Sequence, residues 1–84
     1  RPFNGNLRLC FQVSQPSEIK LWIYNAAFSL VMSDQINVAA GYSEWTWDGR
    51  TSGQWVPPGI YTVILTARSN NHHLTRRVHV MVQY

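Results

Sequence analysis

Alternation of apolar and polar side chains, with a period of two residues, is the strongest pattern in this sequence. Between residues 6 and 13 every odd-numbered side chain is apolar, and the set is Leu7, Leu9, Phe11 and Val13. Successive side chains of a β-strand point to opposite faces of a sheet, so this segment is expected to be a strand with one buried face. The other predicted strands are residues 18–25, 28–34, 42–48, 60–68 and 74–83, with a bridging segment at residues 36–41.

Turn-forming residues separate these strands at intervals of about 8–12 residues, and no segment has the 3.6-residue period of a helix. At 84 residues the chain can form one two-layer core, but not a core together with a deep catalytic cleft. We therefore expect residues 1–84 to form a single antiparallel β-sandwich of six or seven strands, as one piece of a larger protein. A small barrel is the structural alternative.

The last two strands predict their own register. If Asn70 and Asn71 are the central residues of a hairpin turn, in the left-handed conformation that asparagine tolerates, apolar side chains meet apolar ones across the strands. The apolar pairs are Tyr61 with Val80, Val63 with Val78, and Ala67 with Leu74. One pair departs from this pattern, because Arg76 faces Leu65. Either the Arg76 stem reaches the edge of the sandwich or a bulge shifts the register.

A turn-rich motif occupies the middle of the chain and reads Trp47-Asp48-Gly49-Arg50-Thr51-Ser52-Gly53-Gln54-Trp55-Val56-Pro57-Pro58-Gly59-Ile60-Tyr61. Its Trp47 is expected in the core, and its Asp48 in an Asx turn that accepts backbone N–H groups. Tyr61 begins the next inward-facing row of side chains. The remaining structural positions supply glycine freedom or a break in the strand, and they are Gly49, Gly53, Pro57 and Gly59.

This motif resembles the signature of the immunoglobulin-like domain first described in flagellar hook-capping proteins, the FlgD type. Related domains lie at or near the C-termini of many secreted bacterial proteins, including type IX secretion cargo. The resemblance extends over essentially the whole chain, with further matches at residues 2–4, 21–25 and 74–78. The sequence departs from the family pattern at Phe28, where glycine is usual, and at the double proline Pro57-Pro58.

The resemblance implies an immunoglobulin-like β-sandwich that acts as a non-catalytic accessory module. Family members use the domain in protein docking, secretion sorting or assembly, so we expect an extracellular or cell-surface location. The expected partners are other domains of the same protein or neighbouring protein subunits.

Neither catalysis, nor a cofactor, nor a metal site is predicted by any set of residues. His72 and His73 are adjacent, so in a strand they point to opposite faces and cannot easily share a metal ion. Glu44 and Asp48 would lie about 13 Å apart along a strand, farther than the carboxylate pairs of glycosidases. Cys10 is the only cysteine and is expected to be exposed. The scattered basic residues behind the net charge of +3 do not favour nucleic acid, and no apolar run is long enough for a membrane span.

Surplus aromatic side chains are the best candidates for a contact surface. Alternation places Trp22 and Tyr24 on the face opposite the apolar row of their strand, with Val31 as a cross-strand neighbour. Trp55 lies in the loop of the motif. Exposed apolar patches mark interaction sites, so these three aromatic residues could stack on a polysaccharide or pack against a protein. A covering loop or edge segment is a further alternative, and pairing of edge strands between copies in a surface filament is another.

Overall fold

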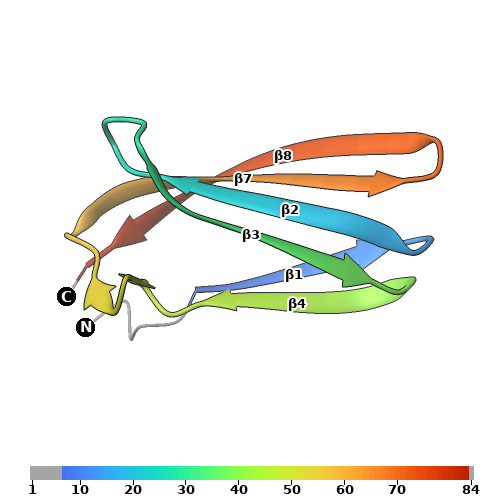
Figure 1. The fold of residues 1–84 in the computed structure, drawn as a ribbon, viewed down its shortest axis with the longest axis horizontal. Helices are drawn as coiled ribbons and strands as arrows, with labels where there is room; N and C mark the ends of the chain where they lie inside the picture. The colour runs from blue at the N-terminus through green and yellow to red at the C-terminus, as the bar shows by residue number, and fades with distance from the viewer. Residues whose placement is uncertain (1–6, 84) are drawn as a thin grey trace.

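The computed structural model describes residues 7–83, which fold into β-strands joined by short loops (Figure 1). The strands are β1 (Leu7–Val13), β2 (Ser17–Tyr24), β3 (Leu30–Val38), β4 (Gly41–Trp47), β5 (Arg50–Thr51), β6 (Gln54–Trp55), β7 (Gly59–Ser69) and β8 (His72–Val82). Six of them are long, and β5 and β6 are additional strands of two residues each. The predicted all-β sandwich is confirmed. The match at residues 2–4 lies outside the described residues.

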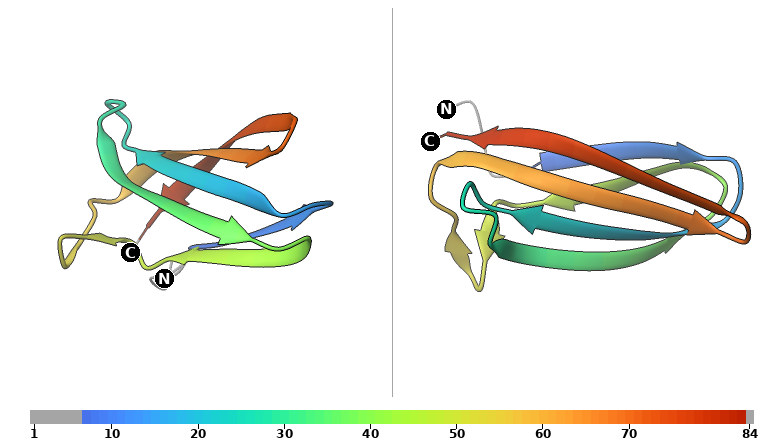
Figure 2. Two further views of the ribbon diagram at one scale, coloured as in Figure 1. Left: turned by 45° about the vertical axis from the view of Figure 1, so that its right-hand side comes forward. Right: turned by 90° about the horizontal axis from the view of Figure 1, so that it is seen from above.

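Two unequal layers form the sandwich (Figure 1). The larger layer is a four-stranded antiparallel sheet with the order β3-β2-β7-β8, and the smaller layer is the antiparallel pair β1-β4. Strands β5 and β6 pair with each other in a separate short ribbon. The views in Figure 2 show that β1 and β4 lie across one face of the larger sheet. The other face of that sheet remains uncovered by strands within the described chain.

The third strand differs from the prediction. Residues 28–34 were expected to be a strand followed by a bridging segment at 36–41, but β3 begins at Leu30 and continues unbroken to Val38. It pairs with β2 along its length, and Ile36 lies opposite Ile19. The polar run at residues 33–35 interrupts the alternation of apolar and polar residues, so the sequence pattern did not predict one continuous strand. An edge strand tolerates a polar side chain such as Asp34 in an inward row.

The predicted register of the last hairpin is confirmed. Val63 pairs with Val78, and Leu65 pairs with Arg76 without a register shift. Arg76 is exposed, so its side chain reaches solvent and no bulge displaces it. The expected left-handed conformation at Asn70 and Asn71 is wrong: they form the turn, but the non-glycine residues with positive φ among residues 7–83 are Phe28 and Ser52.

The core lies between the two layers and is centred on β2. The three inward side chains of that strand are 0 to 1% exposed, and they are Ile19, Leu21 and Ile23. The other buried members are Trp45, Trp47, Val56, Tyr61, Val63 and Val82. Burial of this apolar area drives folding at about 25 cal/mol per Å², so β2 is the strand on which the sandwich depends most.

Candidate functional site

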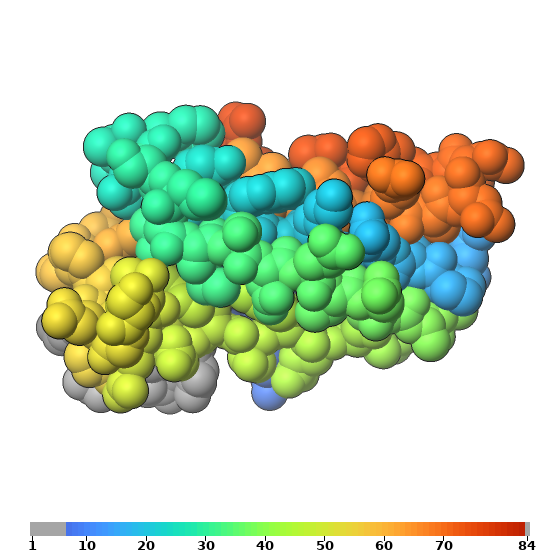
Figure 3. All heavy atoms as spheres, in the orientation of Figure 1, coloured from blue at the N-terminus to red at the C-terminus, as the bar shows by residue number. Residues whose placement is uncertain are grey.

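The outward face of β2 presents the two aromatic residues that the sequence singled out. Trp22 and Tyr24 are half-buried and point away from the core, as the alternation predicts. Trp22 lies between Ser33 on β3 and Ile64 on β7. Figure 3 shows side chains of β2 at the surface, between those of β3 and those of the β7–β8 hairpin.

The expected neighbour Val31 is not part of this outward face. A register shift between Ile23 and Tyr24 pairs Tyr24 with Leu30 and leaves Val31 out of the register. Val31 packs instead against the core. A bulge adds one residue to one strand and so reverses the face that the next side chain takes, which alternation along a single strand cannot predict.

A third aromatic side chain, Phe28, joins Tyr24 on this face. The two rings are stacked, with centroids 4.6 Å apart and planes at 13°. Phe28 is 59% exposed and has a φ of 61°, a left-handed conformation that is strained for a bulky side chain. The loop is closed by three hydrogen bonds, from Phe28 N to Asn25 O, from Ser29 N to Asn25 Oδ1, and from Asn25 N to Ser29 O.

We call Trp22, Tyr24 and Phe28 together the β2 aromatic face. Sequence reasoning did not include Phe28 in this face. The available signal was that Phe28 replaces a usual turn glycine, since a residue at such a position is expected to adopt a left-handed φ. The face has a basic flank. Arg77 on β8 pairs with Ile64, which is the neighbour of Trp22 on β7, and Lys20 lies two residues before Trp22 on β2. Beside Trp22 lies a shallow polar hollow of about 450 Å³, lined also by Lys20, Ser33, Asp34 and Gln35.

Trp55 lies in a different part of the molecule. It belongs to β6 in the short ribbon and is 45% exposed. The Arg50 guanidinium carbon lies 4.2 Å from the centroid of the Trp55 ring, which is the geometry of a cation–π contact. The structure therefore brings Trp22 and Tyr24 together and places Phe28 beside them, whereas Trp55 forms its own contact on the β5–β6 ribbon.

The turn-rich motif is held by hydrogen bonds at its first turn. The backbone N–H of Arg50 donates to Asp48 Oδ1 at 3.0 Å, which confirms the Asx turn. The indole N–H of Trp47 donates to Arg50 O at 3.0 Å, and Val56 N–H donates to Gly49 O at 2.9 Å. Gly49 has a φ of 79°, a conformation in which a larger residue would be strained. Trp47 is buried, as expected.

The second half of the motif is fixed by Tyr61. Its hydroxyl group donates to Pro57 O at 2.6 Å, and its ring meets the Trp47 ring edge-on at 6.1 Å. Gly59, between these partners, has a φ of 154°, and Gly53 in the preceding turn has a φ of 79°. Trp47, Asp48, Gly49, Pro57 and Tyr61 therefore have structural roles in the motif.

The comparisons with known proteins agree with this architecture. The sequence matches the FlgD Ig-like domain over residues 3–71, well over half of the chain. The chain belongs to the FlgD Ig-like domain family. The predicted resemblance is confirmed, and the domain is an Ig-like accessory module. A search of the curated proteins finds no match.

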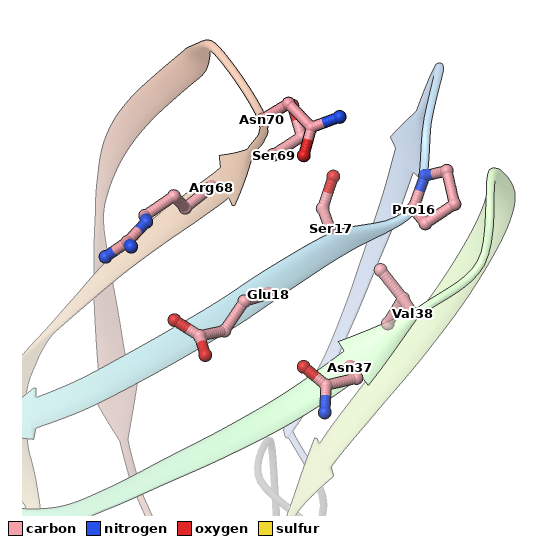
Figure 4. Close-up of a pocket in the computed structure, with 8 residues that line it drawn as sticks. All are labelled: Pro16, Ser17, Glu18, Asn37, Val38, Arg68, Ser69 and Asn70. Atoms are coloured by element: carbon pink, nitrogen blue, oxygen red, sulfur yellow. The ribbon is translucent and has the colours of Figure 1, made fainter.

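Polar groups of this FlgD Ig-like domain are used in structural contacts. At one end of the larger sheet, Glu18, Arg68 and Ser17 are among the residues around an open hollow (Figure 4). Glu18 accepts a hydrogen bond from Gln35 at 2.9 Å, and the Ser17 hydroxyl donates to Gln15 O at 2.8 Å. These contacts stabilise strand pairing and a turn, and they do not combine a nucleophile with a base.

Potential metal ligands in the domain are dispersed. His72 and His73 are neighbours on β8 and point to opposite faces, and His79 lies 3.3 Å from the Thr62 hydroxyl. Within residues 7–83, no three His, Cys, Asp or Glu side chains lie close enough together to hold a metal ion. The same part of the chain contains no helix of the length and apolarity needed to cross a membrane.

Proposed function

We propose that this FlgD Ig-like domain is a non-catalytic docking module of a secreted or cell-surface bacterial protein. In this proposal, the β2 aromatic face is its contact surface for a neighbouring domain or subunit. Docking of this kind would serve secretion sorting or assembly of the larger protein.

The observation that carries the proposal is the conformation of Phe28. A left-handed φ costs a non-glycine residue about 1–2 kcal/mol, yet the ring held by this strained backbone is 59% exposed. Stacking on Tyr24 offsets part of that cost, at about 0.5–1.5 kcal/mol for an aromatic pair. Strain that keeps an apolar ring at the surface does not increase core burial, and it is typical of sites selected for contact.

The composition of the β2 aromatic face also suits a protein partner. Aromatic residues and arginine are enriched in the energetic centres of protein interfaces, and this face has three aromatic rings with Arg77 at its flank. One face of the Tyr24 ring is covered by Phe28, which leaves less flat aromatic surface for stacking on a sugar ring.

Hydroxyl-radical footprinting would test this proposal, with the domain in its parent protein on intact cells compared with the isolated 84-residue chain. We expect oxidation of Trp22 and Phe28 to fall at least about threefold on cells, while oxidation of Trp55 changes little. Equal oxidation of Trp22 and Phe28 in both states would show that nothing docks on this face. Phe28→Gly is the informative variant, because it removes the ring and also relieves the backbone strain, so loss of protection at Trp22 would not reflect unfolding.

Polysaccharide binding is a second candidate, favoured by the hollow beside Trp22. Lys20, Ser33 and Gln35 line this hollow with polar side chains beside one aromatic ring, as a sugar site requires. Titration of the chain with soluble polysaccharides, followed by tryptophan emission, would detect it. A saturable change that Trp22→Ala abolishes and Trp55→Ala retains would establish glycan binding in place of protein docking.

A further inference from the structure

An apolar groove opens between β1 and β8, on the side of the sandwich away from β3. Figure 2 shows these two strands along the same side of the molecule. The groove has a volume of about 370 Å³. We call it the β1–β8 groove, and its main apolar residues are Leu9, Phe11, Val13, Leu65, Leu74 and Val78.

One wall of the groove is a free strand edge. In the described chain β1 pairs with β4 alone, so its second edge has no neighbouring strand. Every second residue of such an edge directs its N–H and C=O groups outward, ready to pair with a further strand about 4.8 Å away. A strand in that position would extend the smaller layer from two strands to three.

The floor of the groove has the inward side chains of β8. Leu74 and Val78 belong to the same face of the sheet as the buried Val63, yet they are 46% and 40% exposed. The smaller layer leaves them uncovered. A strand added beside β1 would bring its own alternate side chains onto Leu74 and Val78.

Arg76 brings a positive charge to the groove and forms no ion pair within residues 7–83. Arg76 lies among these apolar residues, and its guanidinium donates to the neighbouring backbone oxygen of Thr75 at 3.2 Å. The four acidic residues of the sequence all lie in the described chain, and none forms an ion pair with Arg76. Their contacts are elsewhere: Glu44 with Arg8, Glu18 with Lys20, Asp34 with Trp45, and Asp48 with Arg50 N–H.

We propose that the β1–β8 groove binds an extended peptide segment of a partner protein, which adds to β1 as a third strand. The segment has about seven residues, the length of β1, with apolar side chains at alternate positions and one carboxylate that faces Arg76. Strand addition takes its affinity from main-chain hydrogen bonds and its specificity from alternate side chains. A second copy of this chain fits less well, because its net charge is +3 and its four carboxylates are engaged.

A fluorescent nine-residue peptide in which Val and Thr alternate, with Glu at the central apolar position, is a direct probe. We expect saturable binding that weakens at least about fivefold when this Glu is replaced by Gln, and to a similar extent in the Arg76→Gln protein. The two changes together should weaken binding no further than either alone, since they remove one interaction. Additive losses would overturn the pairing of the carboxylate with Arg76.

Two further arms test the groove and the strand edge. Leu74→Glu should weaken binding about tenfold or more, whereas the matched Met81→Glu, 55% exposed on the outer face of the same strand, should not. N-methylation of alternate peptide amides should abolish binding for one set and not for the other, because only one peptide edge faces β1. Equal effects of the two methylated sets would overturn strand addition. Concentration-dependent dimerisation of the unliganded chain that Leu74→Glu abolishes would replace the peptide with a second copy.

Discussion

One row of inward side chains crosses the larger sheet from edge to edge, and the side chains at its two ends differ in their hydrogen-bond and ion-pair partners. The row runs from Asp34 on β3 through Leu21 and Leu65 to Arg76 on β8. At the β3 edge, Asp34 Oδ2 accepts a 2.8 Å hydrogen bond from the indole N–H of Trp45 in the opposite layer. At the β8 edge, the Arg76 guanidinium has no carboxylate partner in the described chain.

The difference shows that the sandwich is closed on one side and open on the other. The β3 edge has a second contact, in which the Thr51 hydroxyl donates to Val31 O at 3.2 Å. The β8 edge has the β1–β8 groove in the equivalent position. Because the smaller layer has two strands and the larger has four, it can cover only part of the inner face. Side chains alternate in the same way on β2 and β8. The inward apolar side chains of β2 are nevertheless fully buried, whereas Leu74 and Val78 on β8 are partly exposed.

The largest expected effect lies in the middle of the row. Leu21→Ala should lower the free energy of unfolding by about 2–5 kcal/mol, because Leu21 is 1% exposed and its truncation leaves a cavity. Val78→Ala, at the open edge, should cost less than about 1 kcal/mol. Urea unfolding followed by tryptophan emission measures both, and Leu21→Val is available if the alanine variant does not fold. Equal losses at Leu21 and Val78 would mean that the β8 edge is covered.

A smaller effect is expected at the closed edge. Asp34→Ala should destabilise the domain by about 1–2 kcal/mol, because the buried Trp45 indole loses its acceptor. Asp34→Asn retains an acceptor and should cost less. The control is Glu44→Ala, which removes an exposed ion pair of 3.6 Å with Arg8 and should change stability by less than about 0.5 kcal/mol. If Asp34→Ala lowers the free energy of unfolding no more than Glu44→Ala does, the hydrogen bond from Trp45 to Asp34 does not join the two layers at this edge.

The smallest effect is expected at the open edge. Arg76→Leu should leave the free energy of unfolding within about 0.5 kcal/mol of the parent chain, since no ion pair is lost and the new side chain is apolar. The same urea experiment measures it. If the free energy of unfolding falls by more than about 1 kcal/mol, the contrast between the β3 edge and the β8 edge is wrong, because Arg76 then has a stabilising partner within the chain.

Much of the fold could be predicted because it depends on local pattern. The alternation located five of the six long strands closely, and pairing of apolar residues gave the register of the last hairpin. Asp48 was predicted in its turn because an Asx turn is closed within a few residues. The extent of β3 was missed, since the inward Asp34 interrupts the alternation, and neither its edge position nor its hydrogen bond from Trp45 of the other layer can be read from the sequence.

The candidate site was predicted less completely. Trp22 and Tyr24 were assigned to the outward face by alternation alone, and the structure agrees. Grouping them with Trp55 required knowledge of where the β5–β6 ribbon lies, which no period in the sequence contains. Phe28 was absent from the prediction because its place depends on a left-handed turn and on a ring contact with a residue four positions earlier.

The sequence by itself determined the strands, their two faces and the turn-rich motif, because each follows from neighbours within a few residues or from pairing across one turn. The tertiary structure alone decided which faces are covered. Burial of a strand face depends on the layer opposite it, and the two-stranded layer reaches β2 but leaves Leu74, Val78 and Arg76 in an open groove. Coverage is a property of two sheets packed at about 10 Å, and no single strand encodes it.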